Sequence, residues 1–153
     1  MNLQQPALLK NLTIIKPNFH AFTARFHDKL AESCTEMSYP TALQFNEKSF
    51  TLFCVLERIV KHLDRPTSVA PFLAYHLIYL KNQGASKNDI KLLSNVFYET
   101  LKEHLGKHFT YESQLAWQEA LRFFESFANN SLFNVSNVIS LQQKIEQKQS
   151  HKI

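Results

Sequence analysis

Seven histidines are the residues of this sequence best suited to binding a metal. Only His104 and His108 are four positions apart, a spacing that would put two imidazoles on one helix face for a divalent cation. Gly106 would break a helix between them and no third ligand is nearby, so no metal site is expected there. His76 is different, because it is the one polar residue in an apolar helical stripe.

Other side-chain chemistry is sparse. Two cysteines, Cys34 and Cys54, form neither a disulfide framework nor a four-ligand zinc site, and Cys54 stands among apolar residues typical of a core. The sequence has no nucleophile elbow, no phosphate-binding loop and no paired carboxylates in an apolar segment. Hydrolysis and phosphoryl transfer are therefore not indicated, and we do not expect an enzyme.

The composition is that of one ordinary globular domain. The 153 residues are 44% hydrophobic and 20% charged, and only two are glycine, which favours long helices over a sheet with many turns. The net charge of +4 comes from scattered basic residues, so nucleic acid is not an expected partner. No apolar run is long enough to span a membrane and no signal segment opens the chain, which makes the cytoplasm the expected location.

Apolar residues recur at steps of three and four, the period of an α-helix. Prolines, glycines and capping residues such as Ser86 and Thr110 separate the helical stretches. The predicted fold is all-α, with six to eight helices. The main stretches are 8–15, 19–30, 47–62, 69–80, 87–105 and 110–128.

Several short motifs occur in register along this helical pattern. They are ARFHDKL at 24–30, LDRP at 63–66, LGKHFT at 105–110 and AW at 116–117. With them the chain resembles the single-domain bacterial globins and the globin part of flavohaemoglobins, from about residue 8 to residue 128. The resemblance implies a globin-like domain over 1–130 and a C-terminal helical extension or frayed tail over 131–153.

The resemblance also assigns the positions that handle haem in that family, and each of them departs from the usual residue. The haem-binding histidine falls at Leu80, the distal residue at Lys48 and the distal tyrosine at His27. The phenylalanine that packs on the porphyrin falls near Thr41, in a break between helices, so Tyr39 or Phe45 could take its place. Leucine has no donor atom, so Leu80 cannot hold iron.

His76 lies one helical turn before Leu80 on the same stripe. A helix shifted by about one turn, roughly 5.4 Å, would place His76 under the iron. The alternative is a half-buried histidine that is hydrogen-bonded within an altered core.

The favoured hypothesis is a globin-like fold without haem that serves as a binding or regulatory module. An empty cavity costs about 24 cal/mol per Å³, so we expect Leu80 with Phe53 or Phe97 to fill the pocket, unless it is collapsed or holds an apolar ligand. The partner would be an unknown protein or an apolar small molecule, and a homodimer is left open.

The alternative hypothesis is a haem protein with an unusual ligand set. Haem b would be held by His76 as the only metal ligand on the proximal side, with His27 or Lys48 on the distal side. Binding or sensing of oxygen or nitric oxide would be its role.

Overall fold

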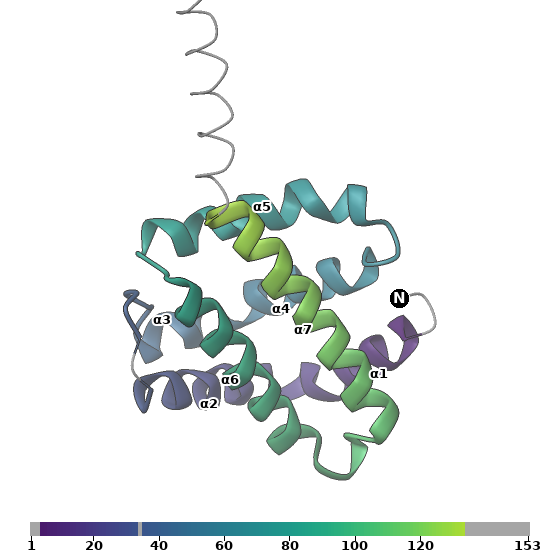
Figure 1. The fold of residues 1–153 in the computed structure, drawn as a ribbon. Helices are drawn as coiled ribbons and strands as arrows, with labels where there is room; N and C mark the ends of the chain where they lie inside the picture. The colour runs from purple at the N-terminus through teal and green to yellow at the C-terminus, as the bar shows by residue number, and fades with distance from the viewer. Residues whose placement is uncertain (1–3, 34, 134–153) are drawn as a thin grey trace, which may run out of the picture.

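The computed structural model describes residues 4–33 and 35–133, which form seven α-helices and no strand, as the periodicity predicts (Figure 1). Two 3₁₀ turns, Lys16–Asn18 and Gly106–His108, join consecutive helices. The predicted tail beyond residue 133 lies outside the described residues, and the last helix passes the expected boundary at residue 130. The helices are α1 (Gln5–Ile15), α2 (Phe19–Ala31), α3 (Ala42–Glu47), α4 (Ser49–Lys61), α5 (Pro66–Asn82), α6 (Lys87–Leu105) and α7 (Tyr111–Leu132).

Local sequence signals set several helix ends. The Ser86 side chain accepts a hydrogen bond from the Asp89 backbone N–H and Asp89 reaches back, so the predicted capping box opens α6. Thr110 accepts from the Ser113 backbone N–H at the start of α7. Gly84 and Gly106 follow α5 and α6 with φ of 80° and 50°, the left-handed conformation that glycine adopts most easily.

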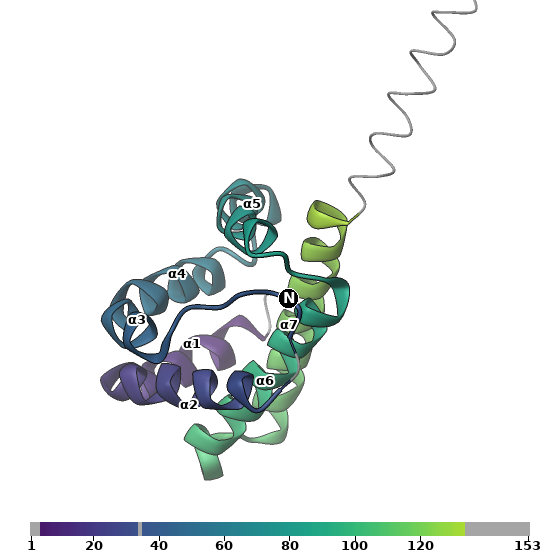
Figure 2. The same cartoon turned by 90° about the vertical axis from the view of Figure 1, so that its left-hand side faces the viewer.

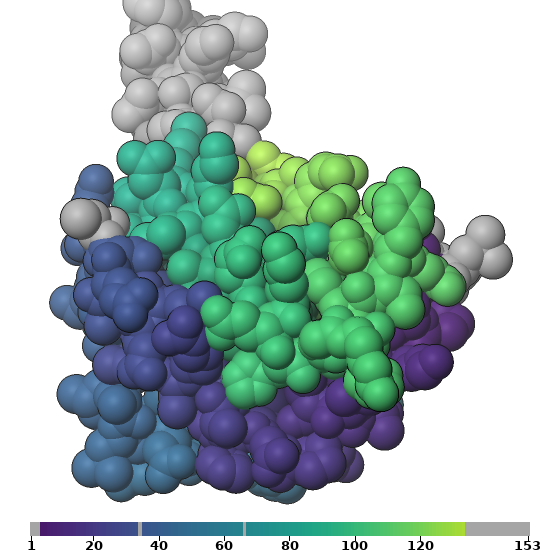
Figure 3. Space-filling view, turned by 90° about the horizontal axis from the view of Figure 1, so that it is seen from below, coloured from purple at the N-terminus to yellow at the C-terminus, as the bar shows by residue number. Residues whose placement is uncertain are grey.

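The helices cross one another in layers. In the view from below, α2 (dark blue), α6 (teal) and α7 (green) lie side by side (Figure 3). α1 packs against α4 and α7, while α5 packs mainly against α7 (Figure 1). α4 and α5 therefore pack against different helices, and there is space for side chains or a ligand between them.

Buried apolar side chains form two clusters. The larger one gathers residues of α1, α2, α4, α6 and α7 around Trp117, whose exposed fraction is 2%. The indole Nε1 donates a hydrogen bond of 3.0 Å to the buried Asn11 Oδ1 on α1. The smaller cluster joins α5 to the start of α6 and the end of α7, through Val69, Leu77, Ala128 and their neighbours.

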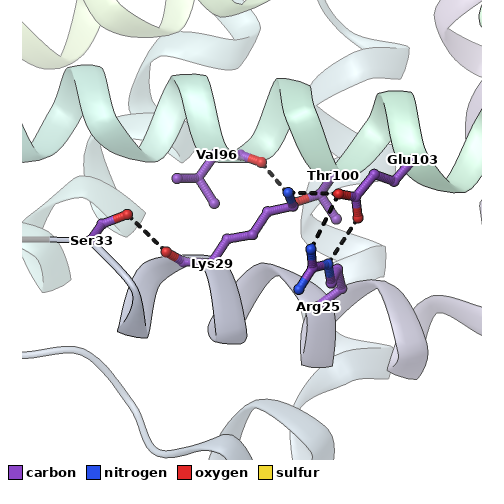
Figure 4. Close-up of polar contacts among 6 residues, drawn as sticks. All are labelled: Arg25, Lys29, Ser33, Val96, Thr100 and Glu103. Carbon is purple, nitrogen blue, oxygen red and sulfur yellow. Dashed lines mark hydrogen bonds and ion pairs between the residues drawn. The ribbon is translucent and has the colours of Figure 1, made fainter.

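An ion cluster ties α2 to α6 at the surface (Figure 4). Arg25 Nε and Lys29 Nζ lie 2.9 Å and 2.7 Å from the two carboxylate oxygens of Glu103. The hydrogen bonds from Arg25 and then from Lys29 lower the pKa of Glu103 to about 2. The two cations therefore keep this carboxyl ionised in acid conditions where a free glutamate would be protonated.

An NMR titration of the Glu103 side-chain carboxyl carbon should show a midpoint at about 2. Because the folded pKa lies below the ordinary 4.5, the stabilisation is present above that value and is lost as the pH falls through about 2. Arg25→Gln should raise the midpoint clearly. Lys102→Gln, which removes a cation next to Glu103 on α6, should change the midpoint far less. A wild-type midpoint near 4.5 would contradict the ion cluster.

Candidate functional site

A hollow of about 410 Å³ lies between α5 and the facing helices α3 and α4. Figure 2 shows α5 standing across from these two helices. His76 and Leu80 line the hollow from α5. Leu52 lines it from α4, and Lys48 from the position just before α4 begins. The helices that carry His76 and Leu52 thus face each other across the pocket.

A second hollow of about 280 Å³ adjoins the first between α4, α6 and α7; it is called the deeper hollow here because Trp117, in the larger core, lines it. Phe26, Leu52, Val55 and Leu93 line both, so the two share one wall. Apart from the Ser94 hydroxyl and the Trp117 indole N–H, the side chains on the wall of the deeper hollow are apolar. The deeper hollow therefore suits an apolar occupant, and the charged and ionisable side chains of the site, such as Lys48 and His76, line the first hollow.

The α5 wall carries both residues considered as positions for the haem ligand, His76 and Leu80. His76 and Leu80 are separated by one helical turn and both line the hollow. The His76 ring lies edge-on to Phe72 and Tyr75, at centroid distances of 4.6 and 5.2 Å. Burial, and then the positive charge of Arg58, lowers the pKa of His76 below its ordinary 6.5, so this imidazole is neutral at pH 7.

The opposite wall differs from the expectation for His27. Lys48 lines the hollow as expected, but His27 does not; α2 presents the neighbouring Phe26 instead. The His27 ring packs edge-on against Tyr39 and Phe45, each at a centroid distance of 5.5 Å. Its Nδ1 is buried without a hydrogen-bond partner. The wall of the hollow thus includes Tyr39 and Phe45 but not His27, and the distal role of His27 stays a prediction.

The two phenylalanines expected to fill the pocket, Phe53 and Phe97, lie in different places. Phe53 lines neither hollow and packs against Phe19, with a centroid distance of 5.1 Å, in the larger core. One helical residue turns the side chain by about 100°, so Phe53 points away from the hollow that Leu52 lines. Phe97 lines only the deeper hollow, and Leu80 lies in the wall without closing the space.

Residues 37–40 form part of the rim of the hollow. A buried carboxylate that the sequence motifs do not connect with the site holds this segment. Asp89, 1% exposed, accepts hydrogen bonds from the backbone N–H groups of Glu36, Met37 and Ser86 at 2.9–3.0 Å. Its place in a capping box is visible in the sequence, but its reach to residues 36 and 37 depends on the tertiary fold.

A sequence model of the globin family matches residues 40–128, more than half of the chain. The chain belongs to the globin family. The match includes α3 to α6 and most of α7, and so covers both walls of the hollow.

Globins hold haem through a proximal imidazole, which the resemblance would place on α5. The position that the resemblance assigns to the haem ligand holds Leu80, and a leucine supplies no donor atom for iron. His76 fits by donor type, being a neutral imidazole on the same wall one turn earlier. Across residues 4–33 and 35–133, no group of three metal-binding side chains adds a second centre, and no helix has the length and apolarity to cross a membrane.

Proposed function

We propose that this globin is a non-haem binding module whose hollow takes a small apolar molecule. One observation carries the proposal: the hollow is open, and its wall includes Leu80, the residue that the resemblance aligns with the haem ligand. A volume of about 410 Å³ lies in the usual range for small-molecule pockets, and the deeper hollow extends it with apolar walls. Of the three states considered for a pocket without haem, collapsed, filled or occupied, occupation agrees best with this geometry.

A second candidate is a haem globin whose iron is held by His76, and the observation that favours it is the place of that imidazole in the hollow wall. Haem b would supply reversible binding of oxygen or nitric oxide. The resemblance to single-domain bacterial globins supports this class of activity. Lys48, on the other wall, could pair with an acidic group of the porphyrin.

The two candidates are separated by titrating the purified protein with haemin and, in parallel, with the uncharged apolar dye Nile red. We expect saturable dye fluorescence from the wild type and no sharp Soret band. Val55→Trp, in the wall shared by both hollows, should abolish dye binding, whereas Leu115→Trp, on the partly exposed face of α7, should not. Leu80→His should create a Soret band, because it restores the missing ligand.

A stoichiometric Soret band in the wild type that His76→Ala removes, and that a remote His108→Ala leaves intact, would overturn the proposal in favour of the haem globin. Far-UV circular dichroism and a urea melt of each variant show that the loss concerns binding and not folding. Dye binding that Val55→Trp and Leu115→Trp change equally would also contradict the proposal.

A further inference from the structure

A third hollow, of about 120 Å³, lies at the corner where α4 ends and α5 begins. Its lining shares no residue with the two apolar hollows. Polar and apolar atoms contribute equally to the surface of its walls. Its walls are Arg58, His62, Arg65, Ser68, Val69 and Phe72.

Two guanidinium groups border this corner and have little negative charge to balance them. Arg58 lies over the Phe72 ring, 4.4 Å from its centroid, and makes no ion pair within the described part of the chain. Arg65 reaches only its sequence neighbour Asp64, at 4.0 Å. Arg25, by contrast, is fully engaged by Glu103 (Figure 4).

Two further polar residues, His62 and Ser68, line the same corner. The His62 Nδ1 is buried and has no hydrogen-bond partner, and the Ser68 hydroxyl stands in the first turn of α5. The N-terminus of α5 has no side-chain cap and no acidic residue in its first turn, unlike that of α6. Pro66 has no N–H and the Ser68 N–H already donates to the Arg65 carbonyl, so it is the helix dipole that adds to the positive potential of the arginines.

We propose that this corner binds a phosphate-type oxyanion, held by Arg58 and Arg65 and hydrogen-bonded by His62 and Ser68. Guanidinium groups suit such an anion because their planar N–H donors bind two of its oxygens at once. The hollow is large enough for one phosphate group and much smaller than the apolar site. The anion is either inorganic phosphate or the phosphate of an ester whose remaining part extends into solvent.

The anion would connect the two walls of the main pocket. Arg58 belongs to α4, while Arg65 and Ser68 belong to the start of α5, and these helices rest on different neighbours. Phosphate would therefore fix the spacing of α4 and α5 at one end. This inference does not depend on what the main hollow binds.

The test is a calorimetric and NMR titration of the full chain with inorganic phosphate and, separately, with phenyl phosphate, against sodium chloride at matched ionic strength. We expect saturable binding of at least one phosphate compound, with amide shifts centred on residues 62–69 and a rise in Tm. Arg58→Gln and Arg65→Gln should each weaken it about tenfold, the value of one charge-assisted hydrogen bond. Arg122→Gln, which removes an equal charge from the exposed face of α7, should leave the affinity unchanged.

The comparison of the two compounds identifies the source: tighter binding of phenyl phosphate indicates an ester, and equal binding indicates free phosphate. Arg65→Gln keeps the proposal falsifiable if Arg58→Gln disturbs packing on Phe72, and urea melts without phosphate report any such loss. Equal effects of chloride and phosphate, or an equal loss in Arg122→Gln, would show general screening and overturn the proposal.

Discussion

Trp117→Ala is expected to lower the free energy of unfolding by about 3–5 kcal/mol, the usual cost of truncating a large buried ring. The indole is 2% exposed and lies at the centre of the larger core, against Phe97 at a centroid distance of 5.7 Å. Its loss also leaves the buried Asn11 Oδ1 without its hydrogen-bond donor. Urea denaturation monitored by circular dichroism measures the change.

Two further variants separate the ring from the hydrogen bond. Trp117→Phe keeps most of the ring but removes the donor, so it should cost less than the alanine variant. Tyr111→Ala, six residues earlier on α7 and 74% exposed, should change stability by no more than about 0.5 kcal/mol. Equal melts for wild type and Trp117→Ala would contradict the central place of this residue.

Asp89→Ala should cost about 3 kcal/mol, because it removes a buried carboxylate and leaves the backbone N–H groups of Glu36, Met37 and Ser86 without their acceptor. It should also weaken Nile red binding, since residues 37–40 line the hollow. Asp28→Ala, an exposed acid on α2, is the matched control and should change neither property. A stable variant with full dye binding would show that Asp89 does not hold the rim.

The same carboxylate should make stability depend on pH. Burial alone would raise the pKa of Asp89, but the hydrogen bonds from Ser86, Glu36 and Met37 outweigh it and hold the pKa below the ordinary 3.8. The contribution is therefore fully present above 3.8 and is lost as the pH falls through the lower folded-state pKa. In urea melts, the stability gap between wild type and Asp89→Asn should narrow over that acid range.

The helix pattern was predictable from periodicity and caps, but some local features were not. α3 is short, and its capping box of Thr41 and Gln44 stands directly after the break at Pro40, where the sequence reading placed only a turn. Cys54, read as a core residue, is exposed. It follows Phe53 on α4, and a helix that is apolar over several consecutive residues does not reveal which of them face outward.

The site was predictable where one helix fixes the register. His76 and Leu80 share a stripe on α5, so their placement on one wall follows from the helical repeat. His27 and Phe53 were misplaced because a neighbouring residue, Phe26 or Leu52, faces the hollow instead, and a resemblance in sequence fixes such a choice only to within one position. The reach of Asp89 joins segments about 50 residues apart, which no local pattern encodes.

Because the buried apolar residues form two separate clusters, the helices beside the cavity can separate without unfolding of the whole molecule. α5 contributes its apolar face to the smaller cluster, and Ile59 and Phe123 are the side chains that contact both clusters in the described chain. Moving α5 away from α4 and from the ends of α6 and α7 that it packs on would therefore leave the core around Trp117 intact. Partial opening of this kind costs less than global unfolding. A guest molecule could thus enter and leave through transient motions of one helix, at rates set by the smaller cluster and not by the stability of the whole fold.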